Sequence, residues 1–176
     1  MTILAANIFT LAVLASELPG AVPVASAEQV FKADGQYQDS SGKCVVRIST
    51  SPMGGFSRLH LPAVSKSRLR IVDDVTGVAF SANGMVVYTT STIYGQPGVF
   101  RFDCAKKSTR RLVGPRRFEA SYPGGLDYFE LAKIADDNIF YYYAPDVNQV
   151  ALARLRNTSH LSTVDFTGSN VRRVES

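Results

Sequence analysis

Short runs of β-branched and aromatic residues recur along the chain from about residue 30 onward. Most runs are five to seven residues long, and Gly, Pro, Asn, Asp and Ser bound them. No window keeps the 3.6-residue apolar period of an amphipathic helix. The sequence therefore predicts an all-β chain. The expected strands span 44–50, 56–61, 68–72, 75–80, 85–90, 98–103, 110–113, 127–134, 138–144, 150–155 and 161–166.

The first 27 residues have the pattern of a secretory signal. An apolar run over residues 3–15 is followed by a proline-broken stretch and by small residues at Ala25 and Ala27, which is the A-x-A form of a cleavage site. The run is shorter than the about 20 residues that a spanning helix needs, and a buried N-terminal helix is the alternative. We expect residues 1–27 to be a signal peptide and residues 28–176 to form one secreted or periplasmic domain.

Two cysteines, Cys44 and Cys104, are the only ones in the chain. In an oxidising compartment two thiols in one small domain usually pair, whereas two reduced buried cysteines are expected if the chain is not exported. A disulfide closing a loop of about 60 residues stabilises a domain by roughly 4 kcal/mol in the chain-entropy model. No C-x-x-C motif is present, so we expect a structural bond.

Comparison of the chain with itself indicates three degenerate repeats. Aligning "SGKCVVRIST" with "NGMVVYTT" places Gly42 opposite Gly84, and aligning "LAKIADDNIFYYY" with "GVAFSANGMVVYTT" places Asp137 opposite the same glycine. In each copy, residues that tolerate positive φ join two strands, as a tight hairpin requires. The expected repeats span approximately 36–72, 73–114 and 126–166.

The central repeat resembles a known propeller blade. "VTGVAFSANGMVVYTTS" followed by "GVFRFDCAKKSTRRLVG" is similar to the WD40-like repeat of TolB-type periplasmic propellers, specifically over residues 73–114, with Asn83 where that family has Asp or Pro-Asp. The resemblance implies four-stranded antiparallel blades. Propellers close with about four to eight blades, and three fit here. We therefore expect a partial or small propeller, or else a compact β-barrel or β-sandwich.

The sequence contains no recognisable catalytic motif. The two histidines, His60 and His160, stand far apart, and no G-x-S-x-G occurs. The pairs at 73–74 and 136–137 are typical of turns. We expect no metal, no cofactor and no enzymatic activity. The alternative is a polysaccharide hydrolase with two facing carboxylates, drawn from Asp103, Asp127, Glu130, Asp136, Asp137 and Asp146.

Two segments are candidate binding surfaces. One is a basic stretch, in which clustered guanidinium and ammonium groups attract anions; a solvated, aggregation-resistant edge is the alternative. The other is an aromatic strand whose alternation puts Tyr141 and Tyr143 on one face and Tyr142 on the other. The candidate residues are Lys106, Lys107, Arg110, Arg111, Arg116, Arg117, Tyr141, Tyr142 and Tyr143.

A formal net charge of +4 also favours anionic partners. We expect an exported binding module for a protein or an anionic envelope polymer, one form being an inhibitor or immunity-type protein. A subunit that closes a propeller with its own copies is a third interpretation. No feature indicates nucleic-acid binding, and Asn157 in "NTS" would accept a glycan only in a eukaryotic secretory pathway.

Overall fold

The computed structural model describes residues 29–52, 57–63, 70–91, 96–115, 126–147 and 160–174. This part of the chain is all-β, as predicted, and every strand pair is antiparallel. One sheet holds β1 (Gly35–Gln38), β2 (Val45–Thr50), β3 (Ser57–Leu61), β4 (Arg70–Phe80), β5 (Met85–Thr90), β6 (Gly98–Asp103) and β7 (Ser108–Val113) in chain order. The other holds β8 (Leu126–Ala135), β9 (Asn138–Val147), β10 (His160–Asp165) and β11 (Arg172–Arg173), also in chain order.

Most predicted strands are confirmed, and those at 85–90 and 98–103 have the observed bounds. The expected turn at Asp73 and Asp74 is wrong, because the two runs around it form the single eleven-residue strand β4. Asp74 is buried with φ 59°, and the pairing of β4 with β5 shifts register between Val75 and Gly77. The short strands β1 and β11 were not predicted, and the expected strand at 150–155 lies outside the described residues.

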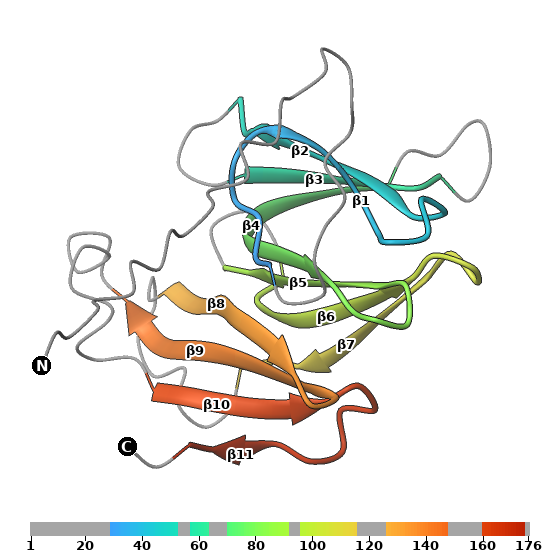
Figure 1. Cartoon of the computed structure of the whole chain (residues 1–176). Helices are drawn as coiled ribbons and strands as arrows, with labels where there is room; N and C mark the ends of the chain where they lie inside the picture. Colours follow the sequence, from blue (N-terminus) through green and yellow to red (C-terminus); the bar gives the residue numbers. More distant parts are fainter. Residues whose placement is uncertain are drawn as a thin grey trace, which may run out of the picture.

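Strand β4 changes partners along its length, and the large sheet coils there. Its first half pairs with β3 and its second half pairs with β5. In a flat sheet β2 and β6 would lie four strand spacings, or about 19 Å, apart. Yet the Cα atoms of Cys44, just before β2, and Cys104, just after β6, are only 5.7 Å apart. The sheet therefore folds back on itself, and β1 to β3 lie over β4 to β7 (Figure 1).

The coil of the large sheet encloses the first hydrophobic core. Phe80 and Phe102 are fully buried there, and an edge-on contact joins Phe80 to Phe31, which bridges to Val78 ahead of β1. The other core residues are Cys44, Val46, Ile48, Leu59, Leu61, Val75, Val86, Tyr88 and Phe100. Strands β2 and β3 contribute to this core together with β4 to β6. Coiling therefore removes the facing apolar sides of these strands from water, and this burial is the main driving force for the coil.

A second core lies between the outer face of β4 to β7 and the four-stranded sheet. It contains Ala79, Val87, Val99 and Leu112 from the large sheet and Phe129, Leu131, Ile134, Ile139, Tyr141 and Val164 from the small one. The molecule is thus sandwich-like, with three levels of strands (Figure 1). The first two predicted repeats belong to one continuous sheet, and the third forms a sheet with β11.

Two buried threonines connect the two sheets by hydrogen bonds. The Thr76 hydroxyl donates to the carbonyl of Phe129, and the backbone N–H of Leu131 donates to Thr89 Oγ1 at 2.9 Å. The two hydroxyl oxygens are 2.7 Å apart. Since the single proton of Thr76 goes to Phe129, Thr89 donates its own proton to Thr76. Side chains of β4 and β5 therefore satisfy backbone groups of β8 in the interior.

The predicted hairpin turns have the expected backbone. Gly42 and Gly84 have φ values of 69° and 70°, and Asp136 and Asp137 have φ values of 49° and 59°. Positive φ at two successive residues, as at Asp136 and Asp137, is the type I′ geometry that matches the twist of the flanking strands. Gly42 and Gly84 are single residues with positive φ in longer connections, so the alignment identified residues with positive φ but turns of different length.

Candidate binding surfaces

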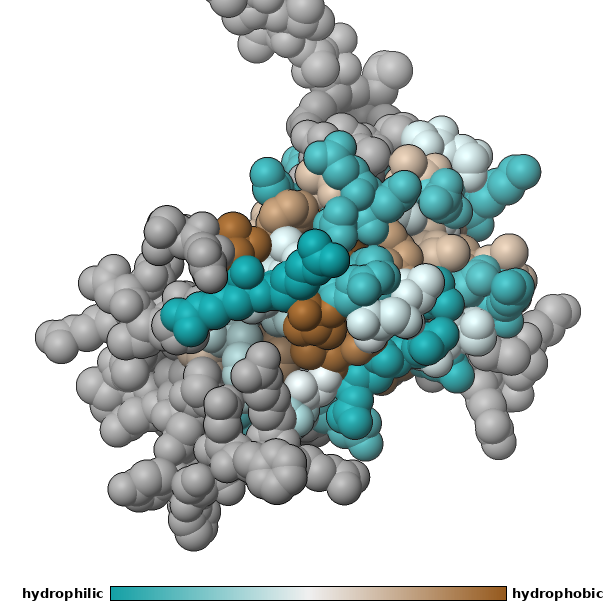
Figure 2. All heavy atoms as spheres, turned by 90° about the horizontal axis from the view of Figure 1, so that it is seen from below, coloured by the Kyte–Doolittle hydropathy of each residue, from teal (hydrophilic) through white to brown (hydrophobic). Residues whose placement is uncertain are grey.

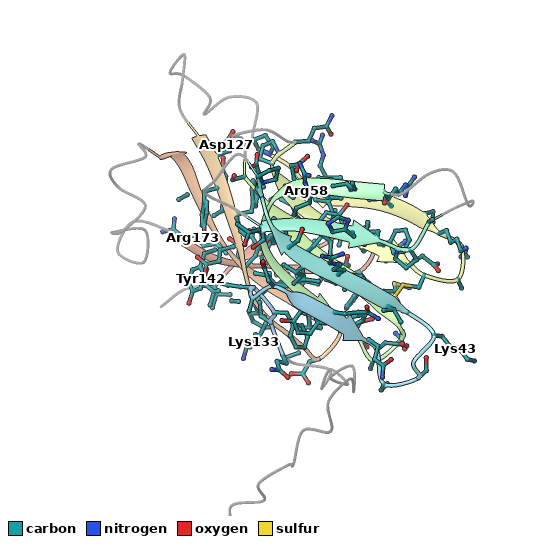
Figure 3. The ribbon with its side chains drawn as sticks, turned by 90° about the horizontal axis from the view of Figure 1, so that it is seen from above. Lys43, Arg58, Asp127, Lys133, Tyr142 and Arg173 are labelled. Atoms are coloured by element: carbon teal, nitrogen blue, oxygen red, sulfur yellow. A yellow bond between two sulfur atoms is a disulfide. The ribbon has the colours of Figure 1, made fainter. Side chains whose placement is uncertain are left out.

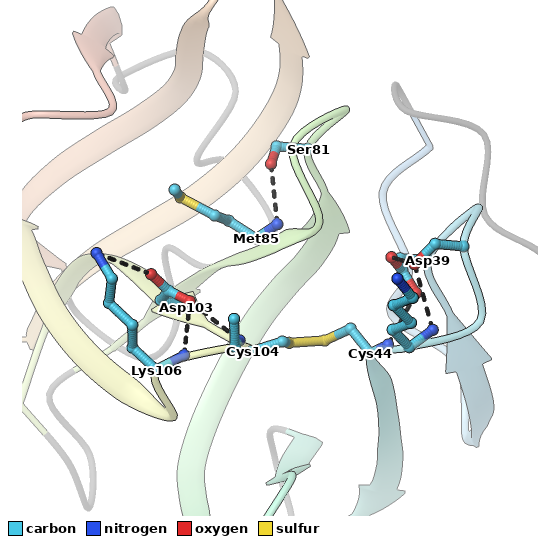
Figure 4. Close-up of a disulfide and its surroundings, with 10 residues drawn as sticks. Asp39, Cys44, Ser81, Met85, Asp103, Cys104 and Lys106 are labelled. Carbon is cyan, nitrogen blue, oxygen red and sulfur yellow. Dashed lines mark hydrogen bonds and ion pairs between the residues drawn. A yellow bond between two sulfur atoms is a disulfide. The ribbon is translucent and has the colours of Figure 1, made fainter.

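The disulfide between Cys44 and Cys104 is present, as predicted. It joins the turn after β1 to the turn after β6, so it fastens the two ends of the coil together (Figure 4). Asp39 organises the first turn, because its Oδ1 accepts a 2.8 Å hydrogen bond from the backbone N–H of Cys44. The bond fits an oxidising environment.

The candidate basic residues lie on the β6–β7 hairpin. Asp103 closes its turn by accepting hydrogen bonds from the backbone N–H groups of Ala105 and Lys106, at 3.0 and 2.9 Å. The bond from Lys106 N–H lowers the pKa of this carboxyl below its usual value. Lys106 Nζ lies 3.8 Å from Asp103 Oδ2, and Lys107 adopts φ 51°. Both lysine side chains are exposed at the tip.

Strand β7 continues this positive surface. Arg110 and Arg111 are both exposed and, being adjacent on a strand, point to opposite faces. Arg110 lies directly opposite Arg101 of β6, and directly opposed like charges on a sheet are destabilising. The Arg101 guanidinium instead contacts Met85 Sδ at 3.8 Å, and sulfur is a weak acceptor. Arg116 and Arg117 lie outside the described residues.

The aromatic strand β9 is divided between core and surface as its alternation predicted. Tyr141 is only 2% exposed, so its side chain belongs to the core and not to a binding surface. Tyr143 packs against the same core, with its ring stacked on Phe129 at 4.5 Å. Phe140 and Tyr142 are half-buried on the outer face, where Tyr142 points away from the large sheet (Figure 3).

The outer face of the small sheet is mixed in polarity. Lys133 Nζ lies 4.9 Å from the Phe140 ring centroid, and Leu161 pairs with Tyr142. Seen from below, hydrophilic residues occupy much of the described surface, and hydrophobic ones form small groups (Figure 2). The outer face of the small sheet thus combines aromatic and aliphatic side chains with a lysine.

A pocket of about 260 Å³ opens on the face of β5 and β6 that is turned away from the small sheet. It lies towards the Thr90–Gly98 end of the β5–β6 pair, whereas the disulfide lies at the Met85–Asp103 end. Tyr88 and Phe100, directly opposite one another, stack with ring centroids 5.1 Å apart and line it. The sequence could not reveal this site, because it depends on the β5–β6 register and on the coiling of β4.

The candidate histidine and acids in the described part of the chain have separate structural partners. His60 Nε2 lies 2.9 Å from Ser49 Oγ, and partial burial, followed by Arg47 and Arg58, lowers the pKa of the imidazole. Asp103 ends β6 of the large sheet, whereas the 136–137 pair forms a turn of the small sheet, and Asp127 accepts a hydrogen bond from Tyr143. Glu130 pairs with Lys32. The side chains of His160 and Asp146 are outside the described set, as is Asn157.

Within the described ranges, no three His, Cys, Asp or Glu residues are grouped so as to hold a metal ion. The same ranges contain no helix with the length and apolar character needed to cross a bilayer. No protein-family model, curated protein or solved structure matches the chain. The similarity to WD40-like repeats stays a prediction.

Proposed function

We propose that this protein is an exported binding module that uses its basic β6–β7 hairpin to hold an anionic partner, a protein or an envelope polymer. An inhibitor or immunity-type protein is one form of such a module. The observation that carries the proposal is the exposure of Lys106, Lys107, Arg110 and Arg111 on one hairpin. The hairpin's acid, Asp103, is already committed to its turn.

The opposition of Arg101 and Arg110 adds support. Like charges in directly opposed positions lower the stability of the free sheet, and an anion held between them would remove that cost. Arginine is suited to this task, because its planar fork binds carboxylate, sulfate or phosphate groups through two hydrogen bonds. The disulfide at Cys104 lies in the turn of this hairpin, two residues before Lys106, and fixes the position of the turn.

A titration with dextran sulfate at several salt concentrations tests the proposal. Changing Lys106, Lys107, Arg110 and Arg111 to Ala should weaken binding at least ~10-fold, equivalent to about 1.4 kcal/mol, and flatten its salt dependence. The matched control changes two lysines and two arginines elsewhere, all exposed: Lys32, Arg47, Lys133 and Arg172. If both variants lose affinity equally, net charge alone explains the binding and the hairpin is not a site.

A further inference from the structure

The pocket lined by Tyr88 and Phe100 adjoins the basic hairpin, whose strand β6 contributes Phe100. The first part of β4 forms its wall, which Ile71 and Val72 line, and a 2.6 Å hydrogen bond joins the Thr90 hydroxyl to the Gln96 carbonyl, both residues being part of the lining. Its volume, about 260 Å³, is just below the roughly 300–1,000 Å³ of small-molecule sites. This size suits one side chain better than a whole small molecule.

The lining favours an apolar group. Four of the seven lining residues, Ile71, Val72, Tyr88 and Phe100, are aliphatic or aromatic, and the other three are Asp73, Thr90 and Gln96. Apolar lining with a smaller number of polar groups is typical of a site that takes an apolar anchor. Ile71 is 44% exposed at this pocket, although its aliphatic side chain would gain from being covered.

The charges around the pocket are unequal. Its one acid, Asp73, is neutralised by Arg58, whose Nε lies 2.7 Å from Asp73 Oδ1. Arg70 precedes the lining residue Ile71 in β4 and donates to Thr109 Oγ1 at 2.7 Å. Thr109 also hydrogen-bonds the Tyr88 hydroxyl. The rim is therefore positive.

Arg111 brings a second guanidinium to the same rim. It is the cross-strand partner of Phe100 and thus shares its face. Arg111 Cδ and Phe100 Cε2 each lie 3.3 Å from where a Cβ on Gly98 would stand, so the stem of Arg111 runs close to the ring. The same added Cβ would be 2.3 Å from the carbonyl of Val113, so only glycine permits this close approach of β6 and β7.

We infer that the pocket binds an apolar side chain within an acidic segment of a partner protein. The apolar side chain packs against Tyr88, Phe100 and Ile71, and neighbouring carboxylates face Arg70 and Arg111. The inference deepens the proposed function, on which it rests for the anionic character of the partner. It selects a protein over an envelope polymer, because a polymer of charged sugars offers no aliphatic side chain to fill this volume.

Blocked tripeptides are suitable probes. Titrated into the ¹⁵N-labelled protein, the sequence Glu-Leu-Glu should shift the amide signals of Ile71, Tyr88, Thr90 and Gln96. Ala-centred Glu-Ala-Glu should bind at least ~10-fold more weakly, since it buries less apolar surface. Gln-Leu-Gln should bind several-fold more weakly at low salt, and that difference should shrink as salt is added.

Two exposed hydrophobic residues provide a matched pair of variants. Ile71→Glu places a carboxylate at the pocket and should abolish the peptide-induced shifts, whereas Val171→Glu, at the equally exposed (45%) Val171 of the other sheet, should leave them intact. Equal effects of the two variants, or equal affinities of the leucine and alanine peptides, would overturn the inference.

A third variant separates this inference from the proposed function. Changing Lys106, Lys107 and Arg110 to Ala should reduce dextran sulfate binding while the tripeptide affinity stays within about twofold, because these residues do not line the pocket. If the triple variant loses polymer binding but neither it nor the wild type binds the tripeptide, the inference about the pocket is overturned and the hairpin proposal stands. Tripeptide binding at the pocket with unchanged polymer binding overturns the hairpin proposal alone.

Discussion

Replacing Thr89 with Val should weaken the junction between the two sheets. The two side chains have nearly the same shape, so the change removes a hydroxyl without opening a cavity. Thr89 is fully buried and accepts the Leu131 N–H at 2.9 Å. In the variant that N–H has no acceptor, and an unsatisfied buried donor costs about 1–3 kcal/mol. The bond to Thr76 is lost as well, although Thr76 still donates to Phe129.

Together these losses should lower the free energy of unfolding by about 2–3 kcal/mol, which corresponds to a fall in Tm of about 5–10 °C for a chain of this size. Urea denaturation and calorimetry of the oxidised protein measure both quantities. The control is Thr163→Val on the half-exposed outer face of β10, which should change stability by less than about 0.5 kcal/mol.

A double variant tests the shared network. Thr76→Val and Thr89→Val each remove the bond between the two hydroxyls, so their combined effect should be smaller than the sum of the single effects by about 1 kcal/mol. Strict additivity would refute the bond between the two hydroxyls, and a Thr89→Val variant as stable as Thr163→Val would refute the view that Thr89 joins the sheets.

Three further predictions concern the disulfide, the hairpin and pH. Changing Cys44 and Cys104 to Ser should cost about 4 kcal/mol of stability in urea denaturation, and a reducing agent should then have no further effect; if the wild type is equally stable reduced and oxidised, the bond does not hold the coil. Arg110→Gln should raise stability by a few tenths of a kcal/mol at low salt by relieving its opposition to Arg101, while dextran sulfate affinity falls; a fall in stability would show that the arginines do not repel. Because the folded protein lowers the pKa of His60, the unfolded chain binds the proton first, so stability is complete above the ordinary pKa of about 6.5 and is lost as pH falls below it. His60→Gln should remove this part of the pH dependence, and identical profiles would count against it.

Local features of the fold were predictable because local chemistry decides them. β-Branched and aromatic runs identified most strands, and Gly42, Gly84, Asp136 and Asp137 identified hairpin turns with positive φ. The disulfide followed from cysteine number and the expected compartment. The division of β9 into a core face and an outer face followed from strand alternation. Which of the two faces is buried, and therefore whether Tyr141 belongs to the core, is decided by the packing.

The coil of the large sheet was not predictable in the same way. Its origin is the change of partners in β4 near Asp74, and the sequence pattern of two adjacent acids is more typical of a turn. The pocket also escaped prediction, because it brings Ile71 next to Phe100 through tertiary packing. No local signal encodes how two strands separated by others in the sheet approach one another.

The link between Cys44 and Cys104 also determines how the molecule would respond to mechanical force. A pull applied to the two ends of the chain bypasses β2 to β6, because the covalent bond carries the tension across the 60-residue separation. Only the flanking segments can extend, so the oxidised protein should stretch about 200 Å less than the reduced one at full extension. Tension would act directly on the flanking segments, which include Phe31 of the first core and the whole small sheet, and would not pass through β2 to β6.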